Sequence, residues 1–382
     1  MNDYLTVNLN GDPAKNYVVD QDRTFNTIGL RTKYDQKLSH QFNFAAGLNY
    51  SYTKGNDDFT FFNTSGDNIN TVSGYSGYDL GTFIQTGWHP FEFTRIELGL
   101  RYDIHKAPSI AKQSQAQPRF KWSFFIDEFN SLVISYDRLF MPTNIENLGA
   151  VASLFGNATS PALPEKDNLY EIDFIRNWAN GFNTKFAGFY KESSPGLDDQ
   201  TLGSSTIRVN VNVNKVNVTG LEFALTYNDA ENPFSGYLNA SIIHAYGEGP
   251  VSGGFLPPDS STIAFDLDHD QRLSAVIGIN YQPENWFINI TGIYGSGLSN
   301  GASDYEFKTG LFDFNAGAHT SPAWIFNISG GYTFNIGNGQ TVEPSVYLNN
   351  ILDHEHLIKG AFFSGASYEE RRNLMVKVDY HF

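Results

Sequence analysis

Apolar and polar residues alternate at every second position over most of this chain, and the pattern returns about fifteen times. Side chains on a β-strand point to opposite faces in turn, so this period of two predicts strands with one apolar and one polar face. The polar face is often charged, as with Glu97, Arg101 and Asp103. No amphipathic helix of convincing length interrupts the pattern, which predicts an all-β protein. The clearest segments are FNFAAGLNYSY (42–52), IELGLRYDI (96–104), LEFALTY (221–227), LSAVIGINY (273–281) and WFINITGIY (286–294).

The connections between these segments alternate between short and long. The short links are DQKLSH (35–40), HPFEF (89–93), IDEFN (126–130), ANG (179–181), NDAENPF (228–234), QPEN (282–285) and NIGNGQ (335–340). The long links are expected at 54–77, 105–116, 142–164, 193–208, 247–270, 295–322 and 353–371. Tight turns at one end and long loops at the other are typical of a bacterial transmembrane barrel. We therefore predict an antiparallel up-and-down β-barrel that forms a single domain over residues 1–382.

A soluble β-sandwich or a lipocalin-like barrel is the alternative. A sandwich uses Greek-key connections, which do not sort by length, and a lipocalin has only about eight strands. Many apolar faces also begin or end in an aromatic residue, as the girdles of a membrane barrel require. These residues are Tyr50, Tyr52, Trp88, Tyr102, Trp286, Tyr294, Trp324 and Tyr332.

The chain ends in a strand, NLMVKVDYHF, whose alternation places Leu374, Val376, Val378 and Tyr380 on the lipid side and Lys377 and Asp379 on the lumen side. Bacterial single-chain barrels have even strand numbers, so about fifteen strands is one short. The segment DYLTVNL near the N-terminus is a candidate sixteenth. Either sixteen strands close alone, or the chain is part of a larger barrel.

Composition narrows the function classes. The formal net charge is −16, which disfavours nucleic acid as a partner because nucleic-acid binding needs clustered Lys and Arg. Cysteine is absent, so disulfides and thiolate metal sites are excluded. No stretch approaches 18 consecutive apolar residues, and the start MNDYLTVNLN has neither the basic region nor the apolar core of a signal peptide.

Several phrases, in order along residues 90–382, resemble the barrel of TonB-dependent outer-membrane receptors, especially those of Bacteroidota. IELGLRYD (96–103) is similar to the family's G-[LI]-R-Y-D strand, and VYLNNILDHEHL (346–357) to its V-x-N-[LI]-[FL]-D element. Further resemblances are QPRFKWSFFIDEFNSLVISYDRLFMPT (117–143), the hairpin LPEKDNLYEIDFIRNWANGFNTKFAGFYKE (163–192), NKVNVTGLEFALTY (214–227), FDLDHDQR (265–272) and the closing RRNLMVKVDYHF (371–382). Each match is weak alone, but the ordered set is specific.

The resemblance implies an outer-membrane transport barrel in a Gram-negative bacterium that takes up a ligand such as a siderophore or a glycan. Family barrels usually have about twenty-two strands and enclose a plug on which TonB acts. Nothing here resembles the plug, so the plug and about six strands are expected on another chain or lost. The resemblance also implies that Val378, Tyr380 and Phe382 form the C-terminal signal read by the barrel assembly machinery. A passive sixteen-stranded porin-like channel remains the alternative.

Other motifs carry little chemistry. Asp266, Asp268 and Asp270 alternate like the start of a calcium loop, but the Gly and Glu that an EF-hand needs at its sixth and twelfth positions are Gln271 and Ile277. His354, Glu355 and His356 do not form H-E-x-x-H, and GYSGY (74–78) lacks the last Gly of G-x-S-x-G. We expect no enzyme activity, no cofactor and no metal. An outer-membrane enzyme would need a catalytic cluster on the loops.

The inward carboxylates and Arg101 are expected to be solvated residues of the lumen or to face the plug. Ligand contacts should come from the long loops and the upper lumen, where aromatic side chains could stack on sugar rings or flat chelates. The aromatic candidates are Tyr75, Tyr78, Phe140, Phe255, Tyr305, Phe362 and Phe363.

Overall fold

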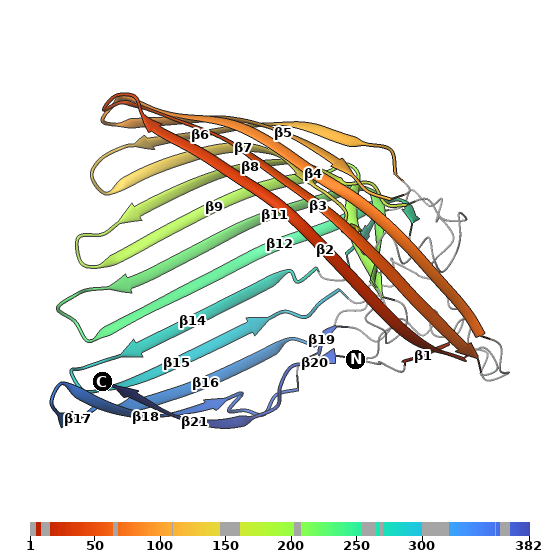
Figure 1. The fold of residues 1–382 in the computed structure, drawn as a ribbon. Coiled ribbons are helices and arrows are strands. Elements are labelled where there is room, and N and C mark those ends of the chain that lie inside the picture. Colours follow the sequence, from red (N-terminus) through yellow and green to blue (C-terminus); the bar gives the residue numbers. More distant parts are fainter. Residues whose placement is uncertain are drawn as a thin grey trace.

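The computed structural model describes residues 5–8, 16–63, 68–108, 110–145, 161–201, 208–253, 264–267, 270–299, 321–355, 357–359 and 367–382. These residues form one large antiparallel sheet that curls round on itself and one small two-stranded sheet near the C-terminus (Figure 1). Within them, helices of the length and hydropathy needed to cross a membrane are absent. The all-β prediction is confirmed.

Fifteen strands follow one another as a meander, which agrees with the number of alternating segments in the sequence. Their bounds are β2 (Asn16–Lys37), β3 (Phe42–Asn63), β4 (Asn68–Phe91), β5 (Thr94–Lys106), β6 (Gln113–Phe125), β7 (Asn130–Met141), β8 (Glu165–Asn177), β9 (Phe182–Ser193), β11 (Arg208–Asn228), β12 (Phe234–Gly253), β14 (Leu273–Tyr281), β15 (Trp286–Gly295), β16 (Ala323–Tyr332), β18 (Gln340–Asn349) and β21 (Asn373–His381). Shorter pieces are β1 (Leu5–Asn8), β10 (Gly196–Thr201), β13 (Ala264–Asp266), β17 (Phe334–Gly337), β19 (Leu357–Lys359) and β20 (Ser367–Tyr368).

All seven predicted short links are tight turns, and they gather at the end of the sheet where the C-terminus lies (Figure 1). Short polar side chains close several of them by bonding the backbone. In the turn between β6 and β7, Asp127 Oδ1 accepts hydrogen bonds from the backbone N–H groups of Phe129 at 2.8 Å and Asn130 at 2.7 Å. Hydrogen bonds from the Asn130 side chain and from these amides hold the pKa of Asp127 below its usual value. The turn before β18 uses Asn338 and Gly339 at positive φ.

The outer face of the curled sheet is apolar and half exposed, as a lipid-facing wall must be. Two rows of aromatic rings cross it. One row, near the tight turns, includes Trp178 and Trp286, and the other includes Tyr170 and Tyr294. Trp178 and Tyr170, and likewise Trp286 and Tyr294, are eight residues apart, so the two rows are separated by about 27 Å along a strand. With strands tilted by about 40°, this is about 20 Å along the membrane normal. This spacing suits the apolar band of a membrane barrel, so the predicted girdles are present.

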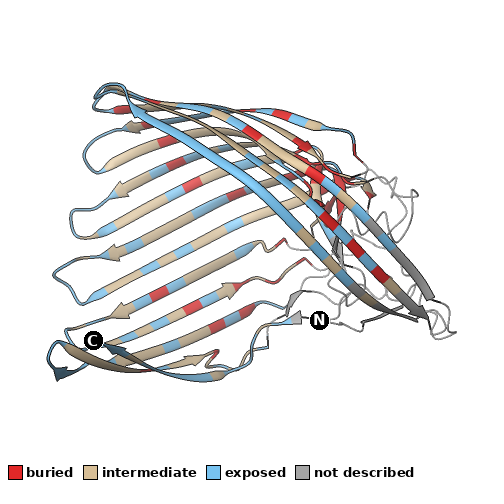
Figure 2. Cartoon of the chain, viewed as in Figure 1, coloured by how far each residue is buried: buried red, intermediate tan, exposed pale blue. Residues whose placement is uncertain are grey.

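The buried residues gather near the long connections (Figure 2). Two small apolar clusters lie there: Ala107, Ile110 and Ile145, and separately Val213, Val216 and Phe265. The middle of the sheet has no such core, because one face meets lipid and the other lines the lumen.

The prediction of a long loop at 54–77 is wrong. Strands β3 and β4 continue through this segment in unbroken register, from Phe42 opposite Trp88 to Phe62 opposite Asn68. The segment looked like a loop because Gly, Asn, Asp and Ser residues interrupt its alternation. Beyond the membrane, however, both faces of a strand can meet water, so polar residues are compatible with continued pairing.

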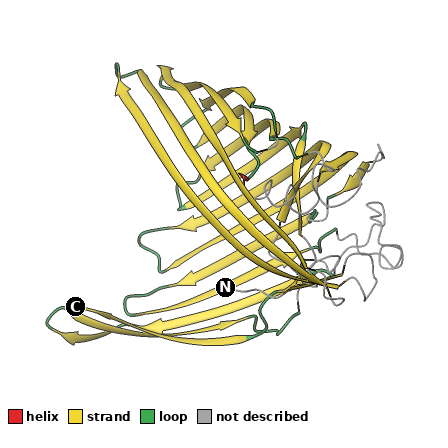
Figure 3. Cartoon of the chain, turned by 45° about the vertical axis from the view of Figure 1, so that its right-hand side comes forward, coloured by secondary structure: helices red, strands yellow, loops and turns green. Residues whose placement is uncertain are grey.

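The candidate sixteenth strand is short. Within the described residues, β1 pairs with β2 over four residues, at the end of β2 that lies far from the tight turns. In the described part of the chain, β21 pairs with β18 alone, and β2 beyond the four residues that meet β1 pairs with β3 alone. Most of β2 and the whole of β21 are therefore the two edges of the described sheet. The view in Figure 3 shows the sheet curving between its edges. These residues therefore do not form a closed sixteen-stranded ring.

Candidate functional site

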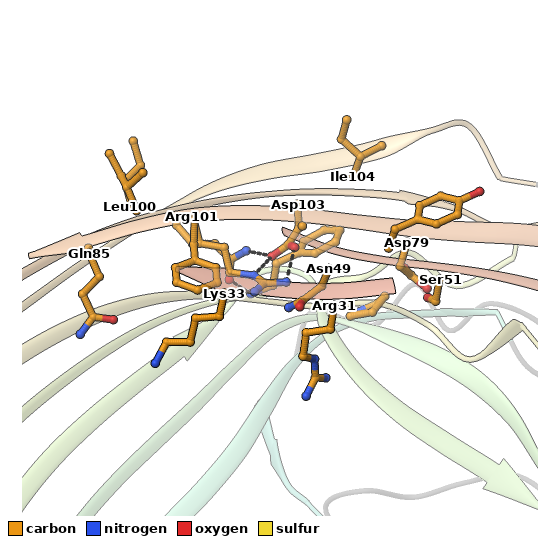
Figure 4. A pocket seen from close by; sticks show the side chains of 18 of the residues that line it. Arg31, Lys33, Asn49, Ser51, Asp79, Gln85, Leu100, Arg101, Asp103 and Ile104 are labelled. Carbon is orange, nitrogen blue, oxygen red and sulfur yellow. Dashed lines mark hydrogen bonds and ion pairs between the residues drawn. The ribbon is translucent and has the colours of Figure 1, made fainter. Parts of the chain in front are cut away.

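A cavity of about 810 Å³ lies against the inner wall formed by β2 to β7. Alternation along the strands brings polar side chains to this wall, while their chain neighbours point outward. Arg31, Lys33, Gln85 and Arg101 lie on one side of the sheet, and Leu100 and Ile104 point to the other (Figure 4). The polar lining residues are Arg31, Lys33, Asn49, Ser51, Asp79, Gln85, Arg101, Asp103, Gln117 and Arg119.

An ion pair within β5 is the best-defined feature of this cavity. Arg101 donates from Nε to Asp103 Oδ2 and from Nη2 to Asp103 Oδ1, both at 2.7 Å. Gln117 on β6 also donates from Nε2 to Asp103 Oδ2. On β4, Gly81 leaves the space that the pair occupies, because a Cβ there would lie 2.1 Å from Arg101 Nη2 and 2.2 Å from Asp103 Oδ1. A missing side chain on one strand thus accommodates a charged pair on the next.

The remaining charges leave the cavity wall cationic. Arg119 contacts Asp137 at 3.3 Å, and Lys33 contacts Asp35 at 2.9 Å, with both side chains of the latter pair largely exposed. Arg31 has no ion-pair partner among the described residues. Because surface pairs such as Lys33 and Asp35 are weak, these cations stay available to an anionic ligand.

His105 closes the loop end of this wall and is 1% exposed. Its Nδ1 lies 2.6 Å from Asp79 Oδ1, and its Nε2 lies 3.3 Å from the hydroxyl of Thr143. These contacts tie β4, β5 and the chain after β7 together. They make the upper end of the cavity a fixed surface.

A second charged cluster lies on the inner faces of β8 and β9. Lys191 contacts Glu165 at 2.7 Å and Asp167 at 3.5 Å. Six residues nearer the turn between β8 and β9, Lys185 contacts Glu171 at 3.4 Å and Asp173 at 3.2 Å. Carboxylates outnumber ammonium groups here, so this part of the wall is acidic where the wall of β2 to β6 is basic.

The aromatic candidates have different fates. Tyr75 lies on β4, where it donates to Asp57 Oδ1 at 2.9 Å and packs on the cluster of Ala107. Tyr78 also lies on β4 rather than in a loop, opposite Lys106. Phe140 lies on β7, where its backbone borders the cavity and its N–H donates to Gln117 Oε1 at 3.1 Å. Its side chain shares the outward face of β7 with Tyr136 and Arg138, so it does not point into the cavity. Phe255, Tyr305, Phe362 and Phe363 lie outside the described residues. Ligand binding by any of these side chains stays a prediction.

In the segment that carries Asp266 and Asp270, the weak calcium-loop candidates, the two carboxylates gather around one arginine. Arg272 Nη2 contacts Asp266 Oδ1 at 2.9 Å, and its Nε donates to Asp270 Oδ2. His244 Nε2 lies 3.0 Å from the same Asp266 oxygen. Asp268 lies outside the described residues. In the described part of the chain, no group of three or more His, Asp or Glu side chains is placed to hold a metal ion.

The segment after β18 contains another cluster of ion pairs and hydrogen bonds. Arg371 donates from Nε to Asp353 Oδ1 at 3.0 Å and from Nη2 to Asp353 Oδ2 at 2.9 Å, and Nη1 donates to Glu355 at 2.8 Å. The Arg371 side chain and the backbone N–H of Arg372 hold the pKa of Asp353 well below its usual value. His354 contributes backbone contacts to Asn350, and His356 lies outside the described residues.

The end of the chain has the orientation that the sequence predicts. Val378 is 64% exposed, Tyr380 51% and Phe382 97%. Val378 lies opposite Pro344 and Tyr380 opposite Val342, on the outward face of β18. Their role as an assembly signal stays a prediction.

Sequence reasoning missed Arg31, Lys33 and Asp79 as cavity residues. A signal was present, since Arg31 and Lys33 occupy alternate positions of a strand whose other face is Leu30, Thr32 and Tyr34. Which strands share a cavity depends on how the sheet curls, and the period of two does not report this.

A family model described as the TonB dependent receptor-like β-barrel matches residues 2–351. No curated protein sequence matches the chain. Among solved structures, the copper transporter OprC is 14% identical with a TM-score of 0.69, covering 97% of this chain and 59% of that one. The FrpB iron transporter from Neisseria meningitidis is 14% identical with a TM-score of 0.68, covering 95% and 60%. The ferric yersiniabactin uptake receptor FyuA from Yersinia pestis is 12% identical with a TM-score of 0.68, covering 96% and 56%.

These structures share the fold of this chain, and the chain spans less than two thirds of the length of each.

Proposed function

This chain belongs to the TonB-dependent receptor β-barrel family, and from that premise we propose that it forms part of the wall of an energised uptake receptor. It is an outer-membrane β-barrel protein of a family of transporters and receptors. Uptake by this route consists of binding and gating, without a covalent step. The receptor's plug would sit against the inner wall, and TonB would act through the plug.

The observation that carries the proposal is the contrast between the two faces of the sheet. The outer face bears exposed residues such as Leu98 and Leu100, at 49% and 47%. The inner face bears the Arg101–Asp103 pair, and Arg31, which has no ion-pair partner in the described part of the chain, around a cavity of about 810 Å³. A cavity of this size admits a small molecule, and its cationic wall favours an anionic one.

The proposed ligand class rests on the positive charge of the cavity wall and on the ligands named for similar solved structures. Solved relatives are named as a copper transporter, an iron transporter and a ferric yersiniabactin receptor. An anionic metal chelate of the siderophore type suits the cationic wall best. A glycan is the second class, for which Phe255, Tyr305, Phe362 and Phe363 would supply stacking surfaces.

The two sheet edges bear on how the barrel closes. β2 and β21 are the first and fifteenth strands of an antiparallel meander, so they run in the same direction. Joining them directly would make a parallel pair. An all-antiparallel closure therefore needs an odd number of additional strands between them. We infer that such strands, and the plug, complete the receptor.

Uptake assays in cells test the proposal. Cells producing the protein are given radioiron-labelled ferric chelates, labelled copper or labelled oligosaccharides, with and without a protonophore. An energised receptor loses uptake when the protonophore is added. Replacing Arg31 and Lys33 together by glutamine should lower uptake of an anionic chelate several-fold. The control variant Lys54→Gln removes a cation from the outer face and should leave uptake unchanged.

The passive channel makes the opposite prediction, because diffusion does not depend on the proton gradient. Uptake that persists undiminished with the protonophore would establish the porin-like alternative and overturn the receptor proposal. The edges of β2 and β21, which do not pair with each other in the described part of the chain, favour the receptor, because a pore made of the described strands alone has no closed wall.

A further inference from the structure

A cationic patch lies on the outer wall of β7 and β8, immediately beyond the upper row of tyrosines. We call it the outer-wall patch and define it as Arg138 and Asn168 with Lys166 above them. Arg138 lies opposite Asn168, and Lys166 lies opposite Phe140, one step farther from the tight turns. The positions on either side of them along the strands point into the lumen, where Asp137 meets Arg119.

The tyrosines beneath the patch place it at the level of lipid headgroups. Tyr136, Tyr170 and Tyr190 stand side by side on three neighbouring strands, with ring centroids 5.0 Å and 6.4 Å apart. Tyrosines on the lipid-facing wall mark the interface between the apolar band and the headgroups. Below Tyr170, Ile172 is 50% exposed and offers an apolar surface to an acyl chain.

The patch carries positive charge without a matching acid. Arg138 Nη1 and the hydroxyl of Tyr136 both donate to Asn168 Oδ1, at 2.9 Å and 3.0 Å, so the guanidinium bonds a neutral acceptor. Neither Arg138 nor Lys166 has an acidic partner among the described residues. The neighbouring carboxylate, Glu192 opposite Asn168, is engaged by Lys215 at 2.8 Å.

The donors are of the kind that recognise a phosphate. A guanidinium binds phosphate oxygens in a two-pronged manner, and an ammonium adds a point charge. With its oxygen occupied by Arg138 and Tyr136, the Asn168 amide still has its NH₂ group to donate. Clustered basic residues at the headgroup level are a recurrent way to bind anionic lipids.

We propose that the outer-wall patch binds the phosphate of a phosphorylated lipid in the outer leaflet. The headgroup phosphate lies between Arg138 and Lys166 and accepts from the Asn168 amide. An acyl chain descends past Tyr170 and Ile172. This contact fixes the height and rotation of the barrel in the membrane. It is independent of which ligand the lumen takes.

Native mass spectrometry of the full chain, purified in a mild detergent, tests the site. The probes are diphosphorylated lipid A and the same lipid after removal of its phosphates. The wild-type chain should retain the phosphorylated lipid and release the other. Replacing Arg138 and Lys166 together by glutamine should weaken binding about 30-fold, since each basic residue near the headgroups contributes about a factor of five. Equal retention of both lipids would overturn the proposal.

The control is a variant with the same loss of charge elsewhere: Lys54→Gln on the outer face of β3 combined with Lys121→Gln on β6. It should bind as the wild type does, and an equal loss would mean that net charge alone is responsible, which overturns the site. Arg138→Lys keeps the charge and should retain most binding, which separates loss of the site from loss of folding. Displacement of the lipid by inorganic phosphate at low millimolar concentration would point to a soluble ligand and refute the lipid assignment.

Discussion

Replacing Ile277 with arginine places a charge on the outer wall close to the middle of the membrane. Ile277 lies on β14, opposite Leu238 on β12 and Gly292 on β15, and is 42% exposed. It is four residues from Tyr281 in the aromatic row near the tight turns. That is about 14 Å along the strand and about 10 Å of height, which is close to half of the apolar band. An arginine at this depth costs about 2–4 kcal/mol in a membrane barrel.

The adjacent residue supplies the matched control. Val276 lies on the same strand at nearly the same height, but it faces the lumen, opposite Asn239 and Ile293. Val276→Arg meets water and polar neighbours, so we expect a loss of about 1 kcal/mol or less, in the range of ordinary surface substitutions. The two variants carry the same new side chain and differ only in the face that bears it.

Urea titration of the full chain folded into lipid vesicles measures the difference in the free energy of unfolding. Ile277→Arg should lower the midpoint clearly more than Val276→Arg. Equal effects, or a larger effect at Val276, would show that β14 does not present Ile277 to lipid. The assignment of the outer and inner faces would then be wrong for the whole meander, because register links every strand to its neighbours.

Three further outcomes are expected. Gly81→Ala pushes a methyl group into the ion pair of β5 and should lower ligand uptake. Gly99→Ala is the control and should leave uptake unchanged, because a Cβ at Gly99 would lie 3.5 Å from its nearest neighbour, the Cβ of Arg119. Similar uptake by the two variants would refute the role of Gly81. Because its partner Arg371 depresses the folded pKa of Asp353 below the ordinary 3.8, the Asp353 contact stabilises the protein above that value and is lost as pH falls through the depressed pKa. Asp353→Asn should therefore lower the urea midpoint at about pH 7 and make no difference at the acid limit, below the depressed pKa; a difference that persists there contradicts this account. Removing Phe382 should reduce the amount of protein assembled in the outer membrane without changing its synthesis, as measured in membrane fractions, and unchanged assembly would exclude it from the insertion signal.

Much of the fold was predictable because the relevant information is local. The alternation of Val276 and Ile277 depends only on strand geometry, so it assigns faces without knowledge of any partner. Turn chemistry is equally local, as Asp127 and Asn338 show by closing their own turns. The inward position of Arg101 followed from the same period of two.

Contacts between distant residues were not predictable in this way. Asp266 resembled part of a cation loop in the sequence, but in the structure it is contacted by His244 on β12, which is 22 residues away. Tyr75 was expected in a loop as a free aromatic surface, and it bonds Asp57 across two paired strands. In both cases the partner is chosen by strand register.

The sequence by itself determined which residues face lipid, which face the lumen, and where the chain turns, because each of these depends on neighbours within a few positions. Only the tertiary structure decided that Gly81 makes room for Arg101 and Asp103, that Arg138 and Lys166 lie together above a row of tyrosines, and that β2 and β21 remain at the edges. The physical reason is that register and curvature are set by hydrogen bonds and packing between whole strands, and the period of two is the same for every register that keeps the faces intact.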